Sequence, residues 1–145
     1  GGFTREMISH WVYLTRRLLG EGKILNARVH WPDDGALSET RLLAELEFGG
    51  VAAVINAAVG GAGPAGTEYT IWGTKKSFRL HSGGRVSATR NGAWQEEFTD
   101  IEDISQTDIL RNIGAAAKAF SREPVKVPTL ADGLAVQRIV ETLIA

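Results

Sequence analysis

The stretch Thr40–Val59, TRLLAELEFGGVAAVINAAV, indicates a β-hairpin and sets the expected fold class. Its first half alternates apolar and mostly charged residues, which predicts a strand with one buried face. Gly49 and Gly50 then supply a turn, because glycine accepts the positive φ angles of a two-residue hairpin. The apolar segment Val51–Val59 completes the pair. The residues expected to face the core are Leu42, Ala44, Leu46 and Phe48.

The same period of two continues on both sides of this hairpin. Upstream, Lys23–Trp31 alternates, with Leu25, Ala27, Val29 and Trp31 expected on one side and Asn26, Arg28 and His30 on the other. Downstream, four more short strands are predicted at Glu68–Trp72, Ser77–His81, Arg85–Thr89 and Ala93–Glu97. The links between successive strands are too short for a parallel crossover, so we expect antiparallel pairing.

Helical patterns flank the strands. Thr4 is the expected N-cap of a helix that runs to Leu19 and ends at Gly20, with a core stripe of Met7, Trp11, Leu14 and Leu18. A second helix is predicted over Asp108–Phe120. A third opens at Thr129 or Asp132 and packs through Leu134, Val136, Ile139, Val140 and Leu143. The expected fold is α+β, an open, mainly antiparallel sheet of about six strands with helices packed on one face, in a single domain spanning residues 1–145.

Composition narrows the function classes. The 145 residues include 16 basic and 17 acidic side chains with no long run of either sign, which argues against nucleic acid or an anionic membrane as a partner. The absence of cysteine excludes disulfides and thiolate zinc sites and fits a cytoplasmic location. No apolar run reaches the ~18 residues of a membrane span. Because the chain begins at Gly1 and not at methionine, we expect it to be a piece of a longer protein.

Glu6 and His10 are the candidate catalytic residues. They are four residues apart on the first predicted helix, so their side chains are neighbours on its surface. A carboxylate beside an imidazole orients it and raises its basicity, which suits proton transfer. Tyr13 and Arg17 lie on the same stripe and are candidate substrate-binding residues. The alternative is an ordinary solvated helix face.

Other motifs are interpreted as structural. Gly61–Gly66 spells G-x-G-x-x-G, yet the following residues predict a strand where a dinucleotide site needs a helix. We therefore expect a flexible loop there and no cofactor-binding residue. The histidines lack metal-ligand spacing, so no metal site is expected, and His30 and His81 are assigned to the sheet surface. Ser9 and His10 are adjacent and point about 100° apart, which disfavours a hydrolase pair.

The ordered set of short motifs resembles the C-terminal domain of the glucose-fructose oxidoreductase / inositol dehydrogenase / MocA family. Gly1-Gly2 matches a glycine run before a helix, Glu6 its acid, His10 its histidine, and Leu18-Leu19-Gly20 its end. The resemblance continues through three further segments in the family's order: Phe48-Gly49-Gly50-Val51, Tyr69–Thr74 and Ala131–Leu134. Three positions depart from the pattern: Glu6 replaces the commoner aspartate, Ile8 a frequent glycine, and Lys76 a turn glycine.

The resemblance implies a function shared with a second domain. In that family a Rossmann domain precedes this one and binds NAD or NADP, while this domain faces a sugar, polyol or related carbonyl substrate. His10 would then be the acid/base and Glu6 its orienting carboxylate. The family also implies homo-oligomers, commonly dimers, through the open sheet face. Alone, this chain is expected to bind neither cofactor and to be inactive. The rival hypothesis is a non-catalytic α+β module for dimerisation or small-ligand binding.

Overall fold

The computed structural model describes residues 2–33, 38–99, 111, 113–114, 118 and 127–145. Contacts within the chain divide it into two compact units. The first comprises residues 1–63 and 128–145, and the second comprises residues 64–127. Each unit is described below by itself. The helix predicted over 108–120 falls largely outside the described residues.

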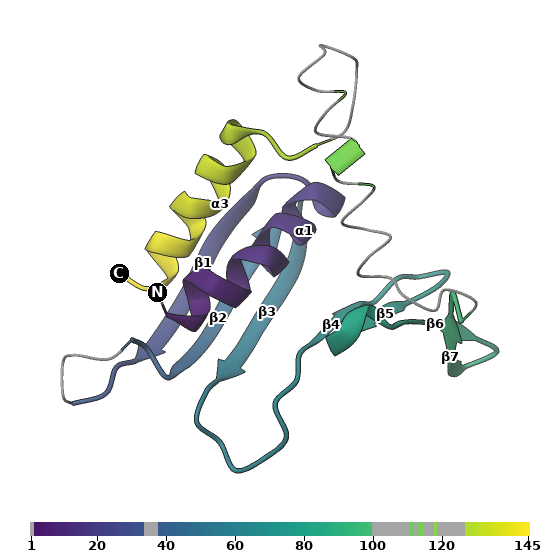
Figure 1. Ribbon diagram of the computed structural model, residues 1–145, viewed down its shortest axis with the longest axis horizontal. Coiled ribbons are helices and arrows are strands. Elements are labelled where there is room, and N and C mark those ends of the chain that lie inside the picture. Colours follow the sequence, from purple (N-terminus) through teal and green to yellow (C-terminus); the bar gives the residue numbers. More distant parts are fainter. Residues whose placement is uncertain (1, 34–37, 100–110, 112, 115–117, 119–126) are drawn as a thin grey trace. The chain divides into compact units, whose positions relative to one another are not determined.

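The first unit is a three-stranded antiparallel sheet covered on one face by two helices (Figure 1). Its strands are β1 (Gly22–His30), β2 (Arg41–Phe48) and β3 (Val51–Ala58), in that order across the sheet. The helix α1 (Ser9–Leu19) continues a π-helical turn, η1 (Thr4–Ile8), and α3 (Leu130–Leu143) lies beside it. The two helices and β2 enclose one hydrophobic core.

The predicted hairpin is confirmed. Strand β2 pairs with β3 along its whole length, and Gly49 and Gly50 form the turn with φ angles of +54° and +85°. All four residues expected in the core are at most 2% exposed, while the alternate side chains of β2 face away from the helices. Alternation in the sequence therefore identified the central strand of this unit and its inner face: Leu42, Ala44, Leu46 and Phe48.

Strand β1 departs from its predicted alternation at one residue. The register with β2 shifts between Ile24 and Asn26, so Leu25 is the extra residue of a β-bulge and is 55% exposed. A bulge leaves its extra residue unpaired and reverses the alternation behind it. Ile24 consequently takes the inner position that the sequence assigned to Leu25, while Ala27 and Val29 stay on the inner side as predicted.

The core stripe of α1 is also corrected. The buried residues of the helix are Thr4, Ile8, Val12 and Thr15, one position on from the predicted stripe. Of that predicted stripe, Trp11 packs against the core as expected, but Met7 is 47% and Leu18 is 55% exposed. Both sets of residues have helical spacing. The buried set includes two polar residues, Thr4 and Thr15, so its hydrophobic pattern in the sequence is weaker than that of the predicted stripe. Thr4 is not the N-cap either, because Phe3 precedes the π-helical turn and no local side chain caps it.

The start of α3 is confirmed at Thr129. The Thr129 hydroxyl accepts a hydrogen bond from the backbone N–H of Asp132, and the Asp132 carboxylate accepts one from the Thr129 N–H, which is a capping box. Four of the five predicted contact residues are buried: Val136, Ile139, Val140 and Leu143. The fifth, Leu134, is 53% exposed.

The second unit contains a four-stranded antiparallel meander. Its strands are β4 (Glu68–Ile71), β5 (Phe78–His81), β6 (Val86–Arg90) and β7 (Ala93–Glu97), with a 3-10 turn, η2 (Ser82–Gly84), between β5 and β6. Each lies within one residue of its predicted bounds. The α+β class and the antiparallel pairing are confirmed, but the described strands form two sheets where one of about six strands was expected.

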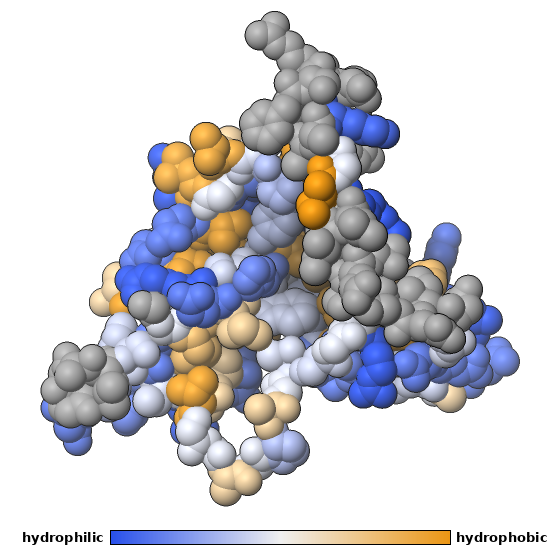
Figure 2. Space-filling view, in the orientation of Figure 1, coloured by the Kyte–Doolittle hydropathy of each residue, from blue (hydrophilic) through white to orange (hydrophobic). Residues whose placement is uncertain are grey.

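The surface over the helices is mixed. Figure 2 shows hydrophilic side chains over much of α1 and α3 and hydrophobic colour at the start of α3, where Leu130 is 95% exposed. Within the described ranges, no helix is long and apolar enough to cross a membrane.

Candidate functional site

One side of helix α1 holds the predicted site, and another packs on the sheet. Ile8, Val12 and Thr15 turn toward the sheet. At about 100° per residue, positions 6, 10, 13 and 17 point roughly 160° away from that stripe. Glu6, His10 and Arg17 are accordingly exposed and Tyr13 is half-buried. Glu6, His10 and Arg17 therefore face away from the core of their own unit, whereas Tyr13 packs against its edge.

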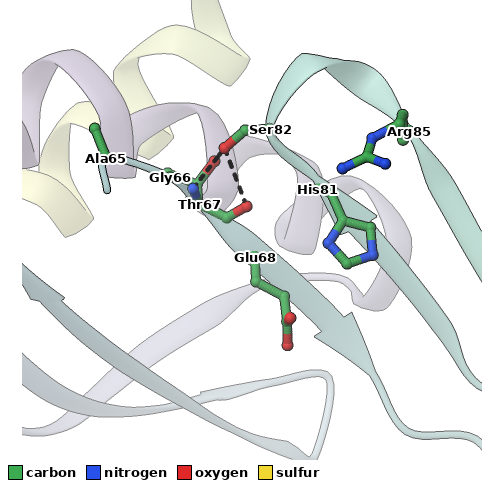
Figure 3. A pocket seen from close by; sticks show the side chains of 7 residues that line it. All are labelled: Ala65, Gly66, Thr67, Glu68, His81, Ser82 and Arg85. Atoms are coloured by element: carbon green, nitrogen blue, oxygen red, sulfur yellow. Dashed lines mark hydrogen bonds between the residues drawn. The ribbon is translucent and has the colours of Figure 1, made fainter. Parts of the chain in front are cut away.

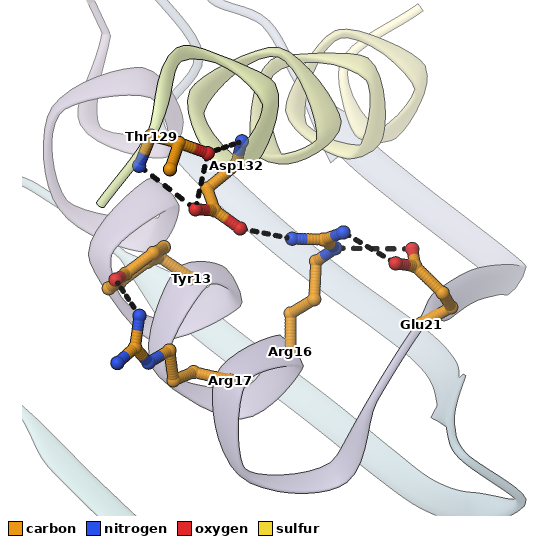
Figure 4. Close-up of polar contacts among 6 residues, drawn as sticks. All are labelled: Tyr13, Arg16, Arg17, Glu21, Thr129 and Asp132. Carbon is orange, nitrogen blue, oxygen red and sulfur yellow. Dashed lines mark hydrogen bonds and ion pairs between the residues drawn. The ribbon is translucent and has the colours of Figure 1, made fainter. Parts of the chain in front are cut away.

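Contacts within the stripe are few. Arg17 Nη1 donates to the Tyr13 hydroxyl over 3.2 Å (Figure 4). In the part of the chain that the structure describes, no hydrogen bond or ion pair joins Glu6 to His10. The shared face brings the four residues together, and the orienting role of Glu6 stays a prediction. A π-helical turn ends at Ile8, two residues before His10, and such turns occur frequently at functional sites.

The side of α1 that faces α3 is held by ion pairs. Arg16 reaches between Asp132 and Glu21, with 3.1 Å from its Nη1 to Asp132 Oδ1 (Figure 4). Hydrogen bonds from the Thr129 hydroxyl and backbone, together with Arg16, hold the pKa of the Asp132 carboxyl below its usual range. Near the other end of α3, Arg5 and Glu141 pair at 2.7 Å. These contacts join α3 to α1 and to the π-helical turn before it.

A residue that the sequence did not single out holds the start of this helix. Glu39 is 1% exposed, and its Oε1 accepts a hydrogen bond of 2.8 Å from the backbone N–H of Thr4. A carboxylate at a helix N-terminus satisfies an otherwise unpaired N–H and favours the helix dipole. Burial alone raises the pKa of the Glu39 carboxyl, but the backbone N–H of Thr4, the backbone of Glu39 and the positive charge of Arg5 together outweigh it, so the pKa is lowered.

Gly2 makes room for that carboxylate. A Cβ on Gly2 would lie 2.4 Å from Glu39 Oε2, and its φ of +103° disfavours any other residue. The glycine before the helix thus has a physical reason in this structure. Glu39 lies 35 residues from Thr4, so no local pattern in the sequence connects them. The only feature of the sequence that could have pointed to Glu39 is that it is a single acidic residue directly before a predicted strand.

The second unit carries a shallow pocket of about 320 Å³ (Figure 3). His81, Arg85 and Glu68 give it its charged and titratable side chains, and Ala65 and Gly66 bring part of the glycine-rich loop to its wall. That loop is followed by β4, as predicted, and not by a helix that would hold a pyrophosphate. Among the described residues, no group of three or more histidine, aspartate or glutamate side chains is arranged to hold a metal.

Three solved structures share this fold. Each of them is described as a "putative oxidoreductase". They are yvaA of Bacillus subtilis (21% identity, TM-score 0.65), YPO2259 of Yersinia pestis (19% identity, TM-score 0.67) and a protein of Bacteroides fragilis (16% identity, TM-score 0.64). Each alignment covers at least 98% of this chain and 47–49% of the other. The chain therefore spans about half the length of these proteins. No family model and no curated protein matches the sequence.

Proposed function

We propose that this chain is the C-terminal substrate-binding and oligomerisation domain of an NAD(P)-dependent oxidoreductase of the glucose-fructose oxidoreductase / inositol dehydrogenase / MocA family. The observation that carries the proposal is the Glu6–His10 stripe, which faces outward from a domain whose fold occupies half of three larger proteins described as oxidoreductases. An outward stripe fits a site completed by another domain. The substrate class is a sugar, polyol or related carbonyl compound, and the location is the cytoplasm.

The glycine-rich segment Gly61–Gly66 does not fit a dinucleotide. The G-x-G-x-x-G segment leads into β4, so its glycines have no helix N-terminus to offer a pyrophosphate. The cofactor is assigned to a Rossmann domain outside this chain. The task left to this domain is proton transfer, in which a ring nitrogen of His10 accepts the proton of a substrate hydroxyl as that alcohol is oxidised. Exposure of His10 leaves the ring open to a substrate from the solvent side.

Glu6 orients the His10 ring in this proposal, and the neighbouring residues hold the substrate. A carboxylate one helical turn before a histidine can accept the second ring N–H and stabilise the charged imidazolium. Arg17 supplies donors and Tyr13 a donor and an acceptor, which suits a polyhydroxylated substrate. Homo-oligomers form through the face of the β1–β3 sheet that the helices leave open.

The test is a pair of histidine variants in the full-length protein that carries this domain. We expect His10→Ala to lower kcat by roughly 10²–10⁴, the usual contribution of general acid–base catalysis. His30→Ala is the matched control, because His30 is an exposed histidine on β1 in the same unit. Turnover that is unchanged in His10→Ala, or equally reduced in both variants, contradicts the assignment.

A non-catalytic dimerisation or ligand-binding module is the second candidate, favoured by the absence of a Glu6–His10 hydrogen bond in the described residues. The upstream gene sequence discriminates between the two. A strand, glycine-rich turn and helix followed by a lysine-proline motif favours the oxidoreductase. A different upstream domain favours the module.

A further inference from the structure

One face of the β4–β7 sheet carries an aromatic and polar surface that the proposed oxidoreductase chemistry does not use. Trp72 is 73% exposed, and its ring meets that of Trp94 edge to face, with 5.7 Å between the centroids. A tryptophan this exposed on a sheet is a marker of an interaction surface. The residues treated below as the Trp72 face are Glu68, Thr70, Trp72, Arg79, His81 and Trp94.

Arg79 ties the aromatic and polar parts of the Trp72 face together. Its guanidinium lies over the Trp94 ring, 4.3 Å from the centroid, which is a cation–π contact. Its Nε lies 3.2 Å from both Thr70 Oγ1 and Glu68 Oε1. The strand register explains this row, because Thr70 is paired with Arg79 across β4 and β5. Arg79 therefore connects the Trp94 ring, which Trp72 contacts, to the polar side chains of Thr70 and Glu68.

The Trp72 face continues into the pocket of the second unit. Glu68 is paired with His81 in the next register position, and both residues line the pocket (Figure 3). Ser82 lies beside the end of the glycine-rich loop, where its Oγ accepts a hydrogen bond of 2.6 Å from the Thr67 N–H, and Arg85 lies on the other side of His81 (Figure 3). A ligand seated on Trp72 thus has hydrogen-bonding groups along one side and a hollow of about 320 Å³ at the end of the row.

We propose that the Trp72 face binds a carbohydrate, with a pyranose ring stacked on Trp72 and neighbouring hydroxyls bound by Arg79 and Glu68. A pyranose presents C–H groups on one face, which suit the electron-rich face of an indole, and hydroxyls at its rim. A sugar hydroxyl can both donate and accept a hydrogen bond. One hydroxyl can therefore accept from Arg79, which only donates, while another donates to Glu68, which only accepts. This site shares no residue with the His10 stripe and does not depend on the proposed oxidoreductase function.

Two other occupants fit the Trp72 face less well. A single-stranded nucleic acid needs cations along its backbone, and Glu68 places a carboxylate in the middle of the row. A second copy of the chain would bury the ion pair of Arg79 with Glu68, which is costly unless every polar group finds a partner. A sugar leaves that pair partly solvated.

The experiment follows the indole N–H signals of the whole chain by two-dimensional NMR while a β-linked glucose tetrasaccharide is added. We expect saturable shifts of the Trp72 and Trp94 signals, and roughly tenfold weaker binding in Trp72→Ala, the effect of losing one stacked aromatic contact. Trp31→Ala is the matched control, because Trp31 is also exposed but lies in the other unit. It leaves the affinity unchanged.

Arg79→Met tests whether the polar contacts of Arg79 are needed for sugar binding without disturbing the fold. The unbranched side chain of methionine keeps much of the packing on Trp94. Weaker sugar binding in this variant, with Trp signals still dispersed as in a folded chain, supports the proposal. Signals that do not shift with sugar overturn it. Shifts that survive Trp72→Ala, or that follow the protein concentration alone and so report a second copy, also overturn it.

Discussion

At the scale of single residues, the buried carboxylate of Glu39 explains how the helix of the candidate site begins. Ser, Thr, Asp or Asn next to a helix usually supplies its cap, but η1 begins without one. Glu39 replaces that cap from the loop before β2, and Gly2 leaves the space for it. Within the described residues, Glu39 Oε2 and Thr4 Oγ1 are buried without a hydrogen-bond partner. A group so placed contributes mainly through its charge and its one bond to Thr4.

Glu39→Gln is expected to lower the free energy of unfolding by about 1 kcal/mol at neutral pH, the usual scale of a cap and of a charge at a helix end. The pKa of Glu39 is lower in the folded chain than in the unfolded chain, so its stabilisation is complete above the unfolded pKa. It is lost as the pH falls through the lowered folded pKa. The difference between wild type and Glu39→Gln should therefore shrink in acid, measured by urea unfolding at a series of pH values.

Glu45→Gln provides the control for that series. Glu45 is an exposed glutamate on β2, so the same substitution should leave the free energy nearly unchanged at every pH. Arg16 and Arg5 also lower the pKa of Glu21 and Glu141, so the wild type loses some stability in acid for other reasons. A Glu39→Gln difference that does not vary with pH would refute the capping role.

The residues of the proposed site were partly predictable from the sequence. Helical spacing alone placed Glu6, His10, Tyr13 and Arg17 on one face, and the structure shows Glu6, His10 and Arg17 exposed and Tyr13 packed against the edge of the core. Spacing does not determine which of several stripes meets the sheet. The choice depends on the partner surface, which is why Met7 and Leu18 were assigned to the core and are exposed. The capping role of Glu39 could not be predicted, because Thr4 and Gly2, which it contacts, are distant from it in sequence.

At the scale of elements, the β2–β3 turn packs against the end of α1. Gly49 and Gly50 both have positive φ, but only one of them touches the helix. A Cβ on Gly49 would lie 1.9 Å from the carbonyl oxygen of Leu19, whereas a Cβ on Gly50 would meet nothing within 4 Å. The Gly49 N–H also donates to the Glu21 carbonyl over 3.0 Å. The turn therefore fixes the C-terminal end of the helix that carries His10.

This pair of glycines separates backbone strain from packing. Gly50→Ala should destabilise the chain by about 1 kcal/mol, the cost of a side chain at positive φ. Gly49→Ala should cost roughly 2 kcal/mol more, because the new methyl group overlaps backbone that cannot move freely. Chemical denaturation of the two variants measures the difference. Equal losses would show that the turn does not press on α1.

The elements themselves were well predicted, and the one shift has a local cause. Alternation and turn glycines gave the seven strands of the described residues nearly to the residue, because most of the links are short and contain a glycine or an asparagine. The bulge at Leu25 was missed. Nothing in KILNARV marks an extra residue, since Ile24 and Leu25 are equally apolar and the sheet alone decides which one turns inward.

At the scale of the whole molecule, the two helices cover one face of the β1–β3 sheet and leave the other open. That open face carries Leu25, Leu43 and Val54, which are 55%, 45% and 70% exposed, among charged and polar neighbours. Apolar side chains that share such a face are typical of an interface. The proposed homo-oligomer would use this face, since the helices already occupy the other.

Val54→Lys tests this assembly. If the open face is the interface, the new charge is buried unpaired, and we expect the dimer to weaken by at least about tenfold in sedimentation velocity. Leu134→Lys is the control, because Leu134 is an exposed apolar residue on α3, on the helical side of the unit. A wild-type chain that stays monomeric, or equal effects of the two variants, would contradict the proposal.

The division of the strands between two sheets could not be predicted from the sequence. Short links identify which strands are consecutive neighbours, but they do not reveal where a sheet ends. The long connection between β3 and β4 contains the glycine-rich loop, and no described pairing joins these two strands. The composition of this connection predicted a loop correctly. The place where strand pairing stops depends on three-dimensional contacts that alternation in the sequence does not encode.

The order of the elements along the chain also constrains how the first unit is made. Strands β1–β3 are synthesised before residue 64, whereas α3, which covers the same core through Val136, Ile139 and Val140, begins at Leu130. A ribosome adds residues far more slowly than a hairpin forms. Part of the inner face of the nascent sheet, where α3 packs on β1, therefore stays uncovered until the second unit has been translated, and it is available to chaperones during that interval.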